Sequence, residues 1–165
     1  MNQSPWSPTQ DDEQSRSTGI ILVDHGSRRV ESNQLLEQLA SAWQTRRGLA
    51  IIEAAHMELA APDIASAFAA CVARGATRIV ISPFFLLPGR HWTTDIPHLA
   101  AQAADPFPHI PWILVAPIAL HELVFSILED RIESCLNNQN DGRGCDVCGE
   151  QIKCQWNLTG QASSS

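Results

Sequence analysis

The chain has 165 residues and a formal net charge of −7, with 18 acidic and 11 basic side chains. This length suits one domain with a substantial core and is too short for two ordinary domains. The net negative charge gives no basic surface of the kind that binds nucleic acid, so nucleic acid is not an expected partner. No apolar run approaches the roughly 20 residues that span a bilayer, so we expect a soluble protein with no membrane partner.

Residues 1–18 are expected to form a disordered N-terminal tail. They are rich in Ser, Gln, Pro and Asp and contain no apolar segment of the kind found in a secretory signal. The acidic run Asp11-Asp12-Glu13 fits poorly with an organelle transit peptide. We therefore expect a cytoplasmic protein.

Residues 19–137 are predicted to form one domain of alternating strands and helices. Apolar runs without polar alternation predict buried strands at residues 19–23, 50–55, 77–82 and 112–115. Apolar side chains at helical spacing predict four helices, at about residues 32–46, 62–75, 94–104 and 121–136. The second of these is expected to begin with Pro62 at its first helical position and to end at Gly75. Strict alternation predicts an α/β fold, a four-stranded parallel sheet with helices on both faces.

Three of these helices carry an apolar stripe that predicts a buried face. The stripe of the first helix comprises Leu35, Leu36, Leu39, Ala42 and Trp43. That of the second comprises Ile64, Ala65, Phe68, Cys71 and Val72, and that of the last comprises Leu123, Val124, Ile127, Leu128, Ile132 and Leu136. Cys71 is thus expected in the core.

Three polar side chains follow successive predicted strands: His25 the first, Glu58 the second and His91 the third. In a parallel sheet they meet at the carboxyl ends of the strands, where such folds bind ligands. Imidazole and carboxylate ligands suit Fe(II), Co(II) and Ni(II), and this set leaves coordination positions open, which favours transient binding or catalysis. Each residue alone has an ordinary structural interpretation, as a loop histidine bonded to backbone or a solvated acid. His56 is a second candidate because it lies near Glu58.

The residues around these positions resemble a known family, the short sirohydrochlorin chelatases. The resemblance lies in Leu22–Arg28 with Asn33, in Met57–Pro62 and in Ser82–Pro97. It covers most of residues 19–136 and implies a chelatase-like sandwich that pairs as a homodimer. It also implies an activity, insertion of a divalent metal into a tetrapyrrole, with active-site histidines matching His25 and His91 and an acid matching Glu58.

Under this resemblance each polar residue has an expected role. The macrocycle loses its inner N–H protons as the metal enters, so His25 and His91 would bind metal and accept protons, while Glu58 would relay protons or hold the metal. Arg90 and Arg28 would pair with the carboxylates of sirohydrochlorin, although Arg28 also fits a solvated loop position.

The aromatic residues of the same stretch have less definite expectations. Phe84, Phe85 and Trp92 could line the macrocycle, but Phe84 and Phe85 are expected mostly in the core. The expected function is that of a sirohydrochlorin ferrochelatase, a lyase of siroheme biosynthesis. Insertion of cobalt or nickel and a non-catalytic metal or tetrapyrrole carrier are the alternatives.

Residues 138–165 read as a polar linker and a cysteine-bearing C-terminal extension. Cys145, Cys148 and Cys154, with Cys135 before them, could bring four thiolates together. Such a set suits a structural zinc or an iron–sulfur cluster, and the spacing does not decide between them. The extension resembles that of plant-type sirohydrochlorin ferrochelatases, which implies a 2Fe–2S cluster and favours Fe(II) as the inserted metal. Cys135 could equally be a small buried hydrophobe.

Overall fold

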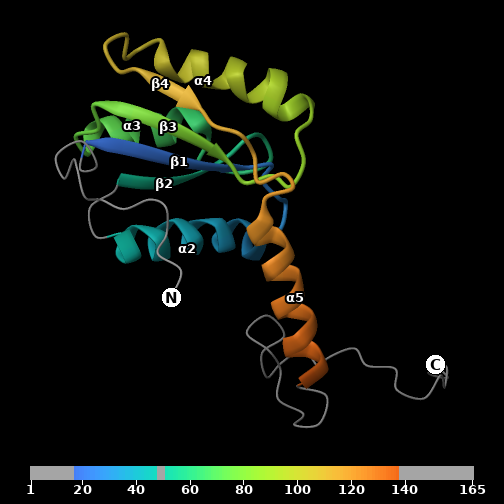
Figure 1. The fold of residues 1–165 in the computed structure, drawn as a ribbon. Coiled ribbons are helices and arrows are strands. Elements are labelled where there is room, and N and C mark those ends of the chain that lie inside the picture. Colours follow the sequence, from blue (N-terminus) through green and yellow to red (C-terminus); the bar gives the residue numbers. More distant parts are fainter. Residues whose placement is uncertain (1–16, 48–50, 138–165) are drawn as a thin grey trace. The chain divides into compact units, whose positions relative to one another are not determined.

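The structure, a computed structural model, describes residues 17–47 and 51–137 (Figure 1). The strands are β1 (Thr18–Asp24), β2 (Ile51–His56), β3 (Arg78–Pro83) and β4 (Trp112–Leu114), and the helices are α2 (Val30–Arg47), α3 (Ile64–Ala73), the π-helix η1 (His91–Asp95), α4 (Ile96–Ala104) and α5 (Glu122–Asn137). The first strand thus begins at the last residue of the predicted tail. The strands form one parallel sheet in the order β2-β1-β3-β4, which confirms the predicted fold class.

The central strand, β1, is buried on both faces of the sheet, as its unbroken apolar run predicts. Ile21 and Val23 point into one core cluster, and Ile20 and Leu22 point into the other. Because β1 pairs with both β2 and β3, both of these neighbouring strands end beside it. The polar loops that follow these strands therefore start close together.

Helices cover both faces of the sheet. α2 lies on one side, and α4 lies on the other together with α3 (Figure 1). The stripe predicted for α2 is only partly correct, because Leu36 is buried while Leu35 and Leu39 are 66% and 40% exposed. Leu36 and Ala40 are one turn apart and face the sheet, so the buried stripe is narrower than the apolar pattern suggests.

α3 packs tightly against β1, and its first turn differs from the prediction. Asp63 is the N-cap, with its side chain accepting the Ser66 N–H at 2.8 Å, so Pro62 precedes the cap instead of opening the helix. Cys71 is fully buried as predicted, and desolvation raises the pKa of its thiol to about 12. A Cβ on Gly19 would lie 2.8 Å from that of Cys71, so this approach requires glycine.

The chain divides into two compact units, residues 1–119 and 120–165. α5 belongs to the second unit and forms where the sequence predicts a helix. None of its residues is buried within the described part of the chain, and Leu123, Ile127 and Ile132 are each more than half exposed. No helix in the described ranges is long and apolar enough to cross a membrane.

Candidate active site

The candidate site lies at the carboxyl ends of the three adjacent strands β2, β1 and β3. Asp24 ends β1 and is in register with His56, which ends β2. His25 comes directly after β1, and Glu58 lies two residues after β2. His91 follows β3 at the first position of η1. The parallel pairing of the strands thus places His25, Glu58 and His91 at the same end of the sheet.

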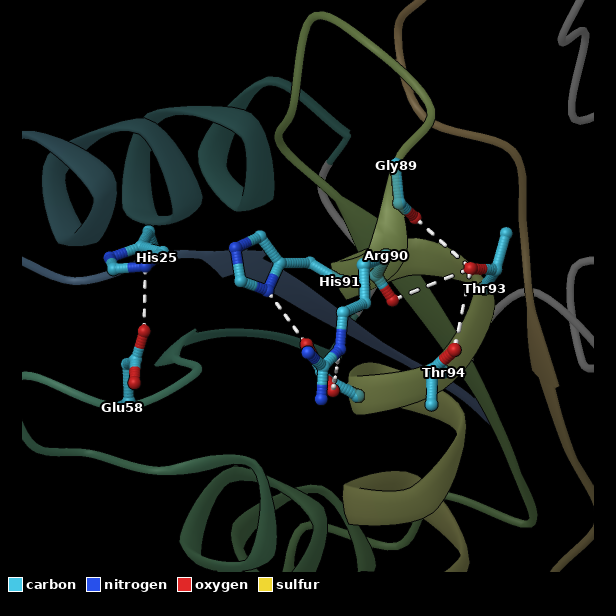
Figure 2. Close-up of polar contacts among 8 residues, drawn as sticks. His25, Glu58, Gly89, Arg90, His91, Thr93 and Thr94 are labelled. Atoms are coloured by element: carbon cyan, nitrogen blue, oxygen red, sulfur yellow. Dashed lines mark hydrogen bonds and ion pairs between the residues drawn. The ribbon is translucent and has the colours of Figure 1, made fainter.

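His25, Glu58 and His91 lie side by side (Figure 2). His25 Nε2 is 2.6 Å from Glu58 Oε1, and the rings of His25 and His91 meet edge to face with their centroids 5.2 Å apart. The three side chains are 42%, 52% and 44% exposed, in that order. A ligand from solvent can therefore reach both imidazoles and the carboxylate.

These three side chains are adjacent but not arranged as a coordination sphere. Over residues 17–47 and 51–137, no group of three or more His, Cys, Asp or Glu side chains is placed to hold a metal ion. His25 Nε2, a potential ligand atom, is bonded to Glu58 instead. A metal that uses this nitrogen must displace the carboxylate or be shared with it.

The His91 ring has two further neighbours. Asp95 Oδ2 lies 2.9 Å from His91 Nδ1, and the Phe85 ring is stacked near His91 with a centroid distance of 6.1 Å. Asp95 also approaches Arg90, with 3.7 Å between Oδ1 and the guanidinium Nε. Sequence analysis missed Asp95, although its spacing of four residues from His91 in a helical segment was an available signal.

His56, the second histidine candidate, is fully buried and does not face the solvent-exposed site. Its Nδ1 is 2.6 Å from Asp24 Oδ1, and its Nε2 has no hydrogen-bond partner among the residues the structure describes. Asp24 Oδ1 also accepts the N–H of Gly26 at 2.9 Å. Gly26 has a φ of +81°, and a Cβ there would lie 3.1 Å from that of His56, so the loop carrying His25 requires glycine.

Residues after Gly26 fix the remainder of this loop. The Ser27 N–H donates to Asn33 Oδ1 at 2.8 Å, and the Asn33 side-chain amide donates back to the Ser27 carbonyl at 2.9 Å. Asn33 lies in the first turns of α2, so the helix holds the loop that follows β1. Arg28, within the same loop, is exposed.

The aromatic residues differ from their predicted placement. Phe84 is 48% exposed, so its predicted core position is wrong: β3 ends at Pro83 and the chain leaves the sheet there. Phe85 is half-buried against the core. Trp92 is half-buried, and its indole N–H donates to the Val115 carbonyl at 3.0 Å, which anchors η1 beyond the end of β4.

The remaining predicted site residues are an exposed arginine and four cysteines. The Arg90 side chain is 83% exposed and can reach a charged ligand. Cys135 lies in α5, half-buried and free of any disulfide. Cys145, Cys148 and Cys154 lie outside the described residues.

Comparisons with known proteins show which family the chain resembles. A family model described as CbiX matches residues 19–135. The chain is 50% identical over 138 residues to the chloroplastic sirohydrochlorin ferrochelatase of Arabidopsis thaliana, covering 83% of this chain and 61% of that protein. It is 29% identical over 121 residues to a sirohydrochlorin cobaltochelatase of Priestia megaterium, covering 72% of this chain and 39% of the relative.

A solved structure gives the same fold. The sirohydrochlorin chelatase SirB from Bacillus subtilis subspecies spizizenii, in complex with cobalt, matches with a TM-score of 0.66 and 31% identity, over 72% of this chain and 50% of that one. The chain spans less than two thirds of the length of each of these three relatives.

Proposed function

Because the chain belongs to the CbiX family, we propose that it is an enzyme that inserts Fe(II) into sirohydrochlorin during siroheme biosynthesis. The observation that carries the proposal is the juxtaposition of His25, Glu58 and His91 at one accessible edge of the sheet. The 50% identity to the Arabidopsis ferrochelatase supports iron as the metal.

The chemistry of insertion uses the residue types present. Both inner N–H protons of the macrocycle must leave as the metal enters, and a neutral imidazole can either bind the metal or take up a proton. His25 and His91 fill these roles, and Glu58, already bonded to His25, accepts a proton or balances the charge of the metal. Arg90 and Arg28, both exposed, pair with carboxylates at the rim of the substrate.

Cobalt is the second candidate metal. The Priestia relative is a cobaltochelatase, and the SirB structure holds cobalt. Imidazole and carboxylate ligands rank Fe(II), Co(II) and Ni(II) without excluding any of them. A protein that carries metal or tetrapyrrole without turnover is the alternative of a different class.

The test follows the absorption spectrum of sirohydrochlorin under anaerobic conditions with Fe(II), Co(II) and Ni(II) in parallel. The expected result is metal insertion faster than the uncatalysed rate, with Fe(II) giving the highest kcat/KM. Binding of sirohydrochlorin without acceleration for any metal would favour the carrier. A highest kcat/KM with Co(II) would make the protein a cobaltochelatase.

We propose that the protein works as a homodimer. In support, the matched part of the chain covers 50% of the SirB chain, so two copies of that part supply about the same length. Light scattering coupled to size-exclusion chromatography should give twice the mass of the 18.1 kDa chain. A single 18.1 kDa species at the concentration used for catalysis would contradict the dimer.

We propose that Cys145, Cys148 and Cys154 bind a 2Fe–2S cluster with Cys135 as fourth ligand. The free, half-buried thiol of Cys135 is compatible with this role, and four cysteine thiolates form a usual ligand set for such a cluster, which supplies a one-electron redox group. Visible absorption of anaerobically purified protein tests it. A colourless protein with stoichiometric zinc would contradict the cluster, and Cys71→Ser is the control that should keep the colour.

We also propose that the protein is cytoplasmic, as predicted from the sequence. The Arabidopsis relative is named as chloroplastic, which makes the chloroplast the alternative to test. Incubation of the full chain with isolated chloroplasts should leave it outside and uncleaved. Uptake into a protease-protected fraction would contradict a cytoplasmic location.

A further inference from the structure

The carboxylate of Asp95 contacts the imidazole of His91 within the candidate site. Asp95 Oδ2 lies 2.9 Å from His91 Nδ1, and the Asp95 side chain is only 29% exposed. His91 begins η1 and Asp95 ends it, so one helical turn places the two side chains beside each other. The contact forms inside η1 and needs no other element.

This contact determines which ring nitrogen carries the proton. An ionised carboxylate accepts hydrogen bonds and donates none, and a neutral imidazole has one N–H and one bare nitrogen. Because Nδ1 faces the carboxylate, Nδ1 holds the proton and Nε2 keeps its lone pair. We propose that Asp95 is a positioning residue that fixes His91 in the Nδ1–H tautomer, so that Nε2 is the atom offered to the incoming metal. The role of Nε2 rests on the proposed function.

The orientation of the ring agrees with this assignment. The His91 side chain extends from η1 towards His25, with Nε2 at the end of the ring farthest from the backbone (Figure 2). Phe85 stacks near the same ring at a centroid distance of 6.1 Å and an interplanar angle of 29°, which restricts its rotation. Histidines that bind metals usually donate their second ring N–H to a carboxylate or carbonyl in this way.

Asp95 also contacts Arg90, but through its other oxygen and at longer range. Oδ1 is 3.7 Å from Arg90 Nε, and the Arg90 side chain is 83% exposed. An ion pair with such an exposed partner contributes little to stability. The bond to His91 is therefore the contact that fixes the geometry, and Arg90→Gln separates the two effects.

The first experiment reads the tautomer directly, without metal or substrate. Long-range ¹H–¹⁵N correlation spectra of histidine-labelled protein, recorded at pH 8.5, distinguish the two neutral tautomers, and His91→Gln assigns the His91 signals. We expect Nδ1–H in the wild type and in Arg90→Gln. Asp95→Asn and Asp95→Ala should show substantial Nε2–H, because neither imposes an acceptor at Nδ1. An unchanged tautomer in both variants would overturn the proposal.

The second experiment follows metal insertion by the full chain. Asp95→Asn should lower kcat by about 10- to 100-fold, the range for removing the partner of a metal-binding histidine, and leave KM for sirohydrochlorin within about twofold of the wild-type value. Arg90→Gln should raise KM and retain kcat. Asp105→Asn, an exposed acid just after α4, should behave as wild type.

The two experiments separate failure of this inference from failure of the proposed function. A changed tautomer in Asp95→Asn with an unchanged kcat would remove Asp95 from catalysis. A wild-type protein that inserts no metal would refute the proposed function, whereas the tautomer spectra would still decide whether Asp95 fixes the ring.

Discussion

Each of the three histidines near the carboxyl ends of β1, β2 and β3 is bonded to one carboxylate. His56 and His91 use Nδ1, towards Asp24 and Asp95, whereas His25 uses Nε2, towards Glu58. The bond through Nδ1 leaves Nε2, the nitrogen farther from the backbone, available to His91. For His25 to bind a ligand through that same atom, the ligand must displace Glu58 or be shared with it. The two imidazoles of the site are therefore not equivalent before the substrate arrives.

Replacing His91 tests the site at the level of one side chain. His91→Ala should reduce Fe(II) insertion by at least about 100-fold, because it removes both a metal ligand and a proton acceptor. The free energy of unfolding should change by less than about 0.5 kcal/mol, since the ring is 44% exposed. Turnover is measured by the absorption assay and stability by urea denaturation. His98→Ala, at an exposed position of α4, is the control, and undiminished turnover in His91→Ala would remove it from the mechanism.

At the residue scale, the sequence predicts neighbours better than it predicts contacts. The meeting of His25, Glu58 and His91 follows from three strand ends in a parallel sheet. The bond between His91 and Asp95 depends on a turn whose geometry the sequence pattern does not specify. The burial of His56 was also unpredictable, because its position beside Asp24 arises from the register of β1 with β2.

At the element scale, a small set of hydrogen bonds joins the two loops that carry His25 and Glu58. The Asp24 side chain accepts from His56 Nδ1 at 2.6 Å, and the Asp24 carbonyl accepts the Met57 N–H at 2.8 Å. The His56 N–H donates to the Pro62 carbonyl at 2.8 Å, farther along the loop after β2. Both loops are thus attached to each other at their bases, next to His25 and Glu58.

Removing the His56 ring should weaken this attachment. His56→Ala should lower the free energy of unfolding by about 2–4 kcal/mol, because it leaves a cavity and deprives the Asp24 carboxylate of a donor. His56→Asn keeps an N–H near the position of Nδ1 and should lose less than half as much. Urea denaturation at pH 7 measures both variants. Equal losses in the two would show that the hydrogen bond to Asp24 contributes nothing.

The N-cap of α3 gives a pH-dependent contribution to stability. Hydrogen bonds from Ser66 hold the pKa of Asp63 below its usual value of 3.8, so the ionised form stabilises the fold. This contribution is present above pH 3.8 and is lost as the pH falls through the lowered pKa. Asp63→Ala should cost about 1 kcal/mol at pH 7, a value limited by the exposure of the side chain.

Urea denaturation at pH 7 and at pH 2.5 measures the loss of this contribution. The difference between wild type and Asp63→Ala should shrink at the lower pH. Asp63→Asn is the matched control, since asparagine caps helices about as well and does not ionise in this range. A cost for Asp63→Ala that stays the same at both pH values would contradict an ionised cap.

The π-helix is the element that the sequence does not predict. The pattern predicts a helix from residue 94, whereas the structure begins η1 at His91 and continues directly into α4. The wide turn is secured by Trp92, which donates to the Val115 carbonyl, a contact with a distant part of the chain. Propensity and apolar spacing describe local preferences, so they do not reveal a turn that depends on such packing.

At the scale of the whole molecule, the fold follows from the alternation of apolar runs and helical stripes. Strict alternation of buried strands and amphipathic helices predicts a parallel sheet. The sequence of one chain does not show what packs against an apolar helix face that is exposed in that chain. The apolar residues of α5 follow the predicted stripe, yet none of its side chains is buried over the residues that the structure describes.

The two units of the chain should be separable. Both core clusters of the described residues are formed by residues between Ile20 and Leu114, which lie within the first unit. A chain ending at Ala119 should therefore unfold cooperatively, with a Tm within about 4 °C of the full chain, the shift that roughly 1 kcal/mol produces in a domain of this size. Circular dichroism during heating measures the transition. Loss of a cooperative transition would show that residues 120–165 complete the core.

The central place of β1 in the sheet has a consequence for how the site forms during folding. His25 follows β1, but Glu58 follows β2 and His91 follows β3, so both contacts of His25 join distant parts of the chain. Such non-local contacts form slowly, because the entropy cost of closing a long loop comes before any contact stabilises the closed form. Neither contact can form until its flanking strand has docked on β1. Recovery of metal insertion during refolding should accordingly lag behind the return of helical signal, which makes catalysis a marker of the last stage of sheet assembly.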